Sequence, residues 1–435
     1  MNAIKLAGAL LATLGTAQAG AEQADYATHG DEALGALIGE ALDRNPRIRT
    51  ALAEHAAARE IVPQVTALPD PRVAVTGFGR QPETRVGPQR GGLAVTQAIP
   101  WFGKLAARGD VATSEAALRD EFVDAVRADI VARVKSAYYD LAYQDEAIRI
   151  TTQQEELLRH YESLARAQYS QGIGLQQAVV KLQAQITRAL NRRTDLQRRR
   201  ATAEATLNVL RDRPVDSAIT ETGGLERPVV DIDIAALRGV AREASPDAKA
   251  AALAIDSAQA GLRLAQRRYW PDVVVGAGWA NVAGRRDDAG RSNPPPDNGK
   301  DTLNFTVGVN IPVFRSSIDA GVREAQARVS AAREAHRGTL LDVDLAIRTI
   351  GLELTTVDEQ IALYENALLQ QAEQALRSTE EAYSTGTTGV LDLLDSEEVL
   401  LEVRLGLTRL ETDYLKALAR MERAIGRAFP ARRQP

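Results

Sequence analysis

The sequence predicts a mainly helical protein with a small β part, built from two tandem copies of one element order. Three observations support this fold class. The chain of 435 residues is rich in Ala, Leu, Arg, Glu and Gln, and aromatic residues make up only 4% of it, which is typical of long packed helices. Two very long helical patterns contain no proline. Segments of polar–apolar alternation precede each of them, as expected for half-buried β-strands.

The tandem copies appear as local matches at nearly constant spacing. Asn45-Pro46 matches Ser245-Pro246 after 200 residues, Ile99-Pro100 matches Ile311-Pro312 after 212, and Tyr169-Ser170-x-Gly172 matches Tyr383-Ser384-x-Gly386 after 214. The small changes in spacing fall in loops, where insertions are tolerated. The sequence therefore predicts two structural repeats, residues 20–215 and 216–435.

The N-terminus predicts an exported protein. Lys5, the apolar run 6–14 and Ala17-Gln18-Ala19 have the form of a signal peptide, residues 1–19. No later stretch approaches eighteen apolar residues, so no membrane-spanning helix is expected in the mature chain. The absence of Cys excludes disulfides, thiolate metal sites, Cys nucleophiles and a lipid anchor on Cys.

The elements of the first repeat follow in order along the chain. A helical pattern over 31–65 is interrupted at Asn45-Pro46, because proline fits a first helical turn but breaks a helix interior. Strands are predicted near 71–79 and 92–99, separated by a polar surface loop over 80–90, then a long helix near 104–170 and a return helix near 175–211. The packing stripe expected on the long helix is Leu118, Phe122, Val126, Ile130, Val134, Ala137 and Leu141.

The second repeat has the clearer patterns. Its strands are predicted near 272–281 and 303–311, its long helix near 315–384 and its return helix near 390–427. In the second strand five apolar residues alternate with Asn304, Thr306, Gly308 and Asn310. The long helix carries a heptad seam of Val343, Ile347, Ile350, Leu354, Val357, Ile361, Tyr364 and Leu368.

Four strands of about nine residues match the roughly 9–11 residues of a tilted membrane-spanning strand. Four strands cannot close a barrel, and lipid does not tolerate open sheet edges. Several chains must therefore share one barrel, and three chains would supply twelve strands and twelve long helices. The apolar strand face would meet lipid, while Asn304, Thr306 and Asn310 would line a watery pore.

Aromatic residues gather where the strands meet the helices: Trp101, Phe102, Tyr269, Trp270 and Phe314. Such residues are enriched at membrane–water boundaries, which predicts that this end lies at the membrane surface. The alternative is that these rings only pack the strand–helix junction.

The sequence shows no sign of enzyme chemistry. Its four His residues are far apart, without metal-ligand spacing, and no catalytic or phosphate-binding motif is present. We therefore expect no catalysis, no cofactor and no metal site. The net charge of −5 argues against nucleic acid as the partner, and Arg198 to Arg200 are expected on a solvated helix face.

The element order, the twin repeat and the segments around Gly172 and Gly386 resemble the TolC family of outer-membrane efflux ducts over nearly the whole mature chain. The most specific segment is 383–395, YSTGTTGVLDLLD, which resembles the turn at the periplasmic tip of those ducts. The resemblance implies a homotrimer in the Gram-negative outer membrane, with a 12-stranded β-barrel continued by a 12-helix α-barrel into the periplasm.

The resemblance also implies roles for the tip residues. Asp392 and Asp395 would form a charged ring at the periplasmic aperture, where clustered carboxylates attract cations. The alternative is that they cap or decorate an exposed helix start. The adaptor-docking residues would be those of the two turns: Gly172, Ile173, Gly174, Leu175, Gly386, Thr387, Thr388 and Gly389. Thr388 replaces an arginine of the best-studied members, and Gln177-Ala178 replaces a Thr-Asp pair, so the aperture lock must differ.

The function expected from this resemblance is a passive exit duct of a tripartite efflux or secretion system. Its partners would be a periplasmic membrane-fusion adaptor and an inner-membrane pump of the RND type. The segment 97–104 resembles the heavy-metal cation efflux subgroup (CzcC/CusC-like), with drugs, other small molecules and secreted proteins as further candidate cargo. The alternative is a structural coiled-coil surface protein or adhesin. The strand pairs favour the duct, because a stalk needs no hairpins in mid-chain.

Overall fold

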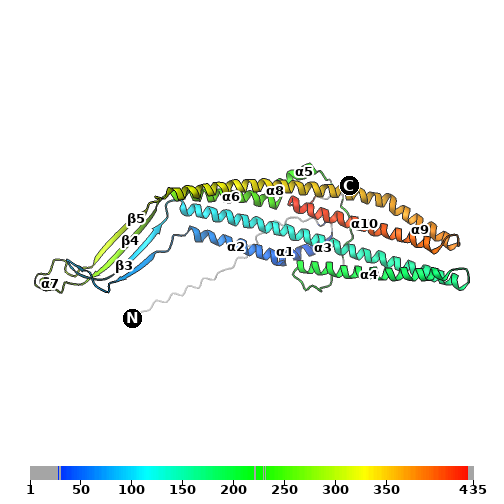
Figure 1. The fold of residues 1–435 in the computed structure, drawn as a ribbon, viewed down its shortest axis with the longest axis horizontal. Helices are drawn as coiled ribbons and strands as arrows, with labels where there is room; N and C mark the ends of the chain where they lie inside the picture. Colours follow the sequence, from blue (N-terminus) through cyan, green and yellow to red (C-terminus); the bar gives the residue numbers. More distant parts are fainter. Residues whose placement is uncertain (1–27, 29–30, 220–221, 229, 231, 430–435) are drawn as a thin grey trace, which may run out of the picture.

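The computed structural model describes residues 28, 31–219, 222–228, 230 and 232–429, so the expected signal peptide lies outside the described residues. The molecule is elongated, with an antiparallel sheet at one end and long helices extending from it (Figure 1). Two helical hairpins form the opposite end. Within the described part of the chain, no helix is long and apolar enough to cross a membrane.

The first repeat begins with two helices joined at the expected proline. Asn45 accepts a hydrogen bond from the Arg47 amide (2.9 Å) and donates one to the Leu210 carbonyl (2.8 Å), which ties this joint to the end of the return helix. The elements are α1 (Glu32–Arg44), α2 (Pro46–Thr66), β1 (Arg72–Gly77), β2 (Glu83–Thr84), β3 (Gly87–Ile99), α3 (Lys104–Ser170) and α4 (Gln176–Leu210).

The predicted surface loop over 80–90 is wrong in part, because strand structure extends into it. β2 pairs with the start of β3, where Glu83 lies opposite Pro88 and Thr84 opposite Gly87. Backbone pairing, to which polar side chains are no obstacle, decides this segment.

The second repeat follows the same order with more irregularities. Its elements are α5 (Ile234–Ala244), α6 (Pro246–Gln266), η1 (Arg267–Tyr269), β4 (Asp272–Val282), α7 (Asp288–Ser292), β5 (Thr302–Asn310), α8 (Arg315–Leu363), the π-helical turn η2 (Tyr364–Leu368), α9 (Leu369–Ser384) and α10 (Val390–Ile425).

The π-turn corrects the prediction of one regular helix over 315–384. The heptad seam is buried from Val343 to Ile361, but Leu368, its expected last member, is 40% exposed. A π-turn inserts one extra residue and rotates everything beyond it. The Tyr364 ring fills the space beside Gly406, where a Cβ atom would lie 2.9 Å from the ring. The turn thus occurs where an aromatic side chain packs against the return helix.

The helices form a layer around α3 (Figure 1), which packs against α2 and α6 near the sheet and against α4 and α10 toward the tips. Its expected packing stripe is buried from Ile130 to Leu141, but Phe122 is 48% exposed and Val123 is buried instead. The prediction that Phe122 is buried is therefore wrong for the single chain. Residues spaced four apart shift gradually around a helix of 3.6 residues per turn, so the stripe does not stay on one face.

One buried ion pair joins the two repeats. Lys135 of α3 is 1% exposed, and its ammonium lies 2.5 Å from a carboxylate oxygen of Glu422 on α10. The other Glu422 oxygen accepts a hydrogen bond from the Phe429 amide. Burial raises the pKa of Glu422, and Lys135 offsets part of that effect.

Candidate functional site

The four main strands of the five-stranded sheet, in the order β1-β3-β4-β5, sort their side chains onto two chemically different faces. Residues directly opposite in neighbouring antiparallel strands share a face. One row across the sheet is Arg72, Thr96, Gly276 and Thr306, and the next row of the same face is Ala74, Ala94, Gly278 and Asn304. The rows of the other face are mainly apolar: Val73, Val95, Ala277 and Phe305, then Val75, Leu93, Trp279 and Leu303.

The polar face depends on small residues. A Cβ atom at Gly278 would lie 2.3 Å from the Asn304 side-chain oxygen, and one at Gly276 would lie 3.0 Å from the Thr96 methyl carbon. A hollow of about 360 Å³ lies at this sheet, and its lining includes Thr96, Asn304 and Thr306. Asn310 lies opposite Asp272 at the helix end of the sheet. The sequence alternation thus corresponds to a separation of faces across all four strands.

The aromatic residues at the strand–helix junction divide into two groups. Trp101 stacks on Trp270, with ring centroids 5.6 Å apart and 7° between the planes, so these two rings do pack the junction. Phe102 and Phe314 are 85% and 79% exposed. The Tyr269 hydroxyl donates a hydrogen bond to Asp319. The Phe102 ring also contacts Trp101 edge-on, with centroids 5.9 Å apart. The packing alternative therefore accounts for the tryptophans, while most of the surface of both phenylalanines stays exposed.

Lys104 links two elements at the same strand–helix junction. The Lys104 ammonium lies 2.7 Å from both a carboxylate oxygen of Asp272 and the Trp270 carbonyl oxygen. The same Asp272 oxygen accepts a hydrogen bond from the Trp101 amide (3.0 Å). The start of α3 is therefore tied to the start of β4.

The two tip turns have the same backbone hydrogen bonds at an offset of 214 residues. Gly172 and Gly386 have φ angles of +75° and +73°, a region that glycine enters without steric cost. The Gly172 amide donates to the Tyr169 carbonyl, and the Gly386 amide donates to the Tyr383 carbonyl. The next two amides of each turn donate to one shared carbonyl, that of Gln168 in the first turn and Ala382 in the second.

The side chains of the two turns differ. Ile173 and Leu175 are exposed apolar residues in the first turn. In the second turn the Thr387 and Thr388 hydroxyls bond within the turn, to the Ala382 carbonyl and to Asp392 respectively. The first tip thus presents an apolar surface and the second a hydroxyl-rich one.

Asp392 and Asp395 both lie exposed in the first turns of α10. Asp392 accepts hydrogen bonds from the Thr388 hydroxyl (2.5 Å) and the Gly389 amide (3.3 Å), which cap the helix start. These two bonds lower the pKa of Asp392 and keep it charged. The capping alternative therefore describes Asp392, and capping leaves the carboxylate at the tip surface.

A buried hydrogen bond between Gln154 and Glu397 joins the two helical hairpins, and it is not among the contacts predicted from the sequence. Glu397 of α10 is buried and accepts a hydrogen bond of 3.0 Å from the Gln154 amide on α3. Arg192 of α4 lies 3.0 Å from Glu398. Burial raises the pKa of Glu397 to about 7. The available signal was a carboxylate at an apolar seam position, between Leu393 and Leu401.

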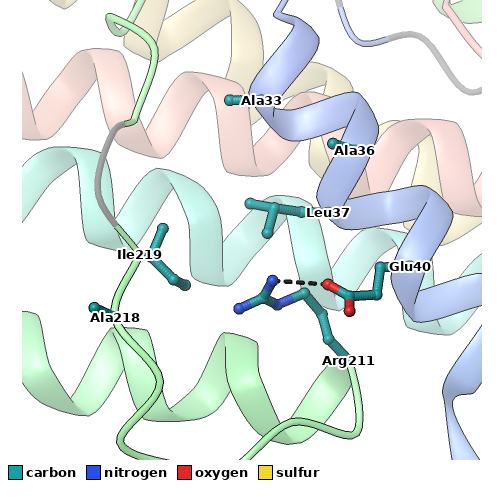
Figure 2. A pocket seen from close by; sticks show the side chains of 7 residues that line it. All are labelled: Ala33, Ala36, Leu37, Glu40, Arg211, Ala218 and Ile219. Atoms are coloured by element: carbon teal, nitrogen blue, oxygen red, sulfur yellow. Dashed lines mark hydrogen bonds and ion pairs between the residues drawn. The ribbon is translucent and has the colours of Figure 1, made fainter.

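Figure 2 shows a second hollow, of about 610 Å³, between α1 and the end of α4. Glu40 faces into it and pairs with Arg211 at 2.8 Å and with Arg213 at 2.5 Å, so its charge is already balanced. Three consecutive arginines of α4 are paired as well, since Arg198 and Arg199 share Asp195, and Arg200 lies between Asp145 and Glu204. They do not form a free basic surface.

The part of the chain that the structure describes contains no group of three or more potential metal ligands. The polar face of the sheet is suited to lining a water-filled space, and the exposed tip turns are suited to contacting another protein.

Comparison with known proteins identifies relatives at low sequence identity. An uncharacterized protein of Haemophilus influenzae is 25% identical over 254 residues, which is 56% of this chain and about half (52%) of that protein. The outer membrane protein TolC of Vibrio cholerae is 20% identical over 404 residues and 91% of both chains.

Solved structures share the fold over nearly the whole chain. A membrane protein from Pseudomonas aeruginosa superposes with a TM-score of 0.76 at 20% identity, covering 92% of this chain and 91% of that one. CusC superposes with a TM-score of 0.71 at 18% identity, covering 92% and 93%.

The family model described as "Outer membrane efflux protein" matches residues 37–210 and 237–427, one segment in each repeat. The expected resemblance to TolC-like proteins is confirmed, and so is the mainly helical fold with a small sheet. Because the matched segments cover most of the chain, this protein belongs to the outer membrane efflux protein family and is an outer-membrane duct rather than an enzyme.

Proposed function

We propose that three copies of this chain form a passive exit duct that continues the path of a periplasmic adaptor and an inner-membrane pump. The observation that carries the proposal is that a single chain has two complementary open edges. In the sheet these edges are β1 and β5, each of which pairs with only one neighbouring strand. Lipid does not tolerate open strand edges, so β5 of one copy should pair with β1 of the next. Three copies would close twelve strands.

The helical layer ends in the same two edges. Near the sheet its order is α2, α3, α6 and α8, and near the tips α4, α3, α10 and α9. The edge of β5, α8 and α9 would thus meet the edge of β1, α2 and α4 of the next copy. Such a heterologous contact generates a ring when the rotation closes.

Exposed side chains on the edge helices support this assembly. On α8, Leu345 and Leu352 are exposed and, at about 100° per residue, lie on the side opposite the buried seam of Ile347 and Leu354. Leu341 and Leu363 are exposed on the same side. On α4 an exposed stripe recurs in steps of four and three: Val180, Ala184, Thr187, Asn191 and Thr194. Small and apolar residues at this spacing are suited to packing against another helix.

Within the ring, the polar sheet face with Asn304, Thr306 and Asn310 would line the pore, and the apolar face would meet lipid. The tip turns, Gly172 to Leu175 and Gly386 to Gly389, would dock the adaptor. Asp392 and Asp395 from three copies would surround the aperture, where their charges favour cations. The segment 97–104 favours heavy-metal cations as the cargo, and drugs or other small molecules are the alternative.

Paired substitutions in β5 test the membrane part of the proposal. Val307→Asp places a carboxylate on the apolar face and should block assembly in the outer membrane, because a charge that faces lipid is destabilising. Thr306→Asp places the same group on the polar face, one residue away, and should be tolerated. The measurement is the amount of trimer in outer-membrane fractions. Equal tolerance of both variants would contradict the assignment of faces.

Conductance in planar bilayers tests the aperture. Asp392→Asn with Asp395→Asn should lower the preference for cations and change single-channel conductance. Unchanged conductance and selectivity would remove these residues from the aperture. A rod without conductance would instead support a coiled-coil surface protein, the alternative function.

A further inference from the structure

We propose that three arginines at the helix end of the sheet bind the headgroups of anionic phospholipids. We call Arg267, Arg268 and Arg315 the basic collar. The inference rests on the proposed function, because it takes the sheet to cross the outer membrane with its helix end in the periplasmic leaflet. It adds a specific lipid partner, which the passive duct does not require.

The basic collar lies directly beside the exposed aromatic residues. Arg267 and Arg268 form the short helix that precedes Trp270, and Arg315 begins α8 directly after Phe314. The Arg267 guanidinium lies against the turn that contains Phe102, since a Cβ atom at Gly103 would be 3.2 Å from its central carbon. Aromatic rings mark the headgroup level of a membrane, so the Arg267 guanidinium beside them is at the depth of lipid phosphates. The Arg268 guanidinium lies against α8, where a Cβ atom at Gly321 would be 3.5 Å from one of its nitrogens.

The charges of the basic collar are available to a ligand. In the single chain all three arginines are exposed, and among the described residues none forms an ion pair. Arg315 begins α8, at the edge that would meet the next copy, whereas Arg267 and Arg268 lie on η1, away from that edge. Two carboxylates of this junction have other partners, because Asp272 binds Lys104 and Asp319 accepts a hydrogen bond from the Tyr269 hydroxyl. Three consecutive arginines of α4 contrast with this arrangement, since Arg198, Arg199 and Arg200 are all paired within the chain.

The basic collar continues the apolar face of the sheet. Val313, two residues beyond Ile311, is exposed like Ile311 and directly precedes Phe314. Trp101 follows Ile99 by the same spacing and stacks on Trp270, the residue that follows η1. A lipid whose acyl chains cover the apolar face would therefore present its phosphate to these guanidiniums.

The chemistry favours anionic over zwitterionic lipids. A guanidinium donates two parallel hydrogen bonds to phosphate oxygens. In phosphatidylethanolamine the headgroup amine offsets the phosphate charge, whereas phosphatidylglycerol keeps a net negative charge. Clustered Lys and Arg residues at a membrane surface attract anionic lipid by roughly 5-fold in affinity for each residue.

The test is native mass spectrometry of the full-length trimer in detergent, titrated separately with phosphatidylglycerol and phosphatidylethanolamine. The unmodified protein should retain phosphatidylglycerol preferentially. The triple variant Arg267→Gln, Arg268→Gln and Arg315→Gln should lose on the order of 100-fold in phosphatidylglycerol affinity, at about 5-fold per arginine. The matched control, Arg188→Gln, Arg333→Gln and Arg377→Gln, removes the same charge from exposed sites far along the helices and should retain the preference.

Three outcomes would overturn the inference while leaving the duct intact, provided that the trimer still conducts in bilayers. The first is equal retention of the two lipids by the unmodified protein. The second is displacement of phosphatidylglycerol by millimolar inorganic phosphate, which would indicate a simple anion site. The third is a change in channel ion selectivity in the triple variant with lipid preference unchanged, which would place the guanidiniums inside the duct. A protein that neither trimerises nor conducts would remove the proposed function itself.

Discussion

The two repeats build the same path of helix, hairpin, long helix, turn and helix, but they do so with different side chains. The first long helix, α3, runs unbroken for 67 residues, whereas its counterpart is divided into α8 and α9 by a π-turn. The tip turns share their hydrogen bonds, yet one exposes Ile173 and Leu175 and the other binds its threonines internally. A repeated backbone therefore needs only a few fixed residues, and the remaining positions are free to specialise.

The largest effect is expected at the buried ion pair that joins the repeats, between Lys135 of the first repeat and Glu422 of the second. Lys135→Met leaves the Glu422 carboxylate buried without its lysine, so the free energy of unfolding should fall by about 3–5 kcal/mol at neutral pH. Denaturant unfolding followed by helical circular dichroism, at constant protein concentration, measures it.

The control for this prediction is the double variant Lys135→Met with Glu422→Leu, which removes both charges. Apolar replacement of a complete buried pair is often neutral, so the double variant should recover most of the loss. If the single and the double variant lose the same stability, packing rather than charge joins the repeats at this place.

The next effect concerns the hairpin contact between Glu397 and Gln154. The folded-state pKa of Glu397, about 7, lies above its usual 4.5, so its stabilising contribution is complete below pH 4.5 and is lost as pH rises to 7. The loss is on the order of 3 kcal/mol at about 1.4 kcal/mol per pKa unit. Glu397→Gln should remove the part of this pH dependence that Glu397 contributes and stabilise the protein above pH 7, as followed by unfolding between pH 4.5 and 8.

Glu402→Gln is the matched control for the pH experiment, because Glu402 lies exposed on the same helix. It should leave the pH dependence as it is in the unmodified protein. Burial also raises the pKa of Glu411 to about 7, so a smaller pH dependence should remain in the Glu397→Gln variant. A pH dependence that is undiminished in this variant would assign the effect to Glu411 alone.

The smallest effect tests what the repeats do share, the glycines of the tip turns. Gly172→Ala and Gly386→Ala should each cost about 1–2 kcal/mol, because both positions have positive φ angles that disfavour a Cβ atom. Gly338→Ala, inside α8 with open space around it, should instead stabilise by roughly 0.5–1 kcal/mol. Clearly unequal costs at the two tips would show that their side chains, and not only the backbone turn, fix the local stability.

Much of the site could be anticipated because local rules govern it. Period-two alternation identified Asn304 and Thr306 as one face of a strand, and the sheet register extends that face across Thr96 and Gly276. The glycines at 172 and 386 marked the turns because backbone conformations with positive φ favour glycine. The roles of the strand face, the aromatic residues and the aspartates remain predictions, and the experiments above test them.

Local sequence patterns suffice to predict the order of elements, the repeat and the family, since proline, glycine and hydrophobic periodicity act over a few residues. Which distant side chains meet depends on the tertiary structure. Gln154 and Glu397 are 243 residues apart in the chain, and Lys135 and Glu422 are 287 apart. The π-turn and the pairing of β2 were also invisible in the sequence. Each depends on the register between elements, which long-range packing sets and no local pattern encodes.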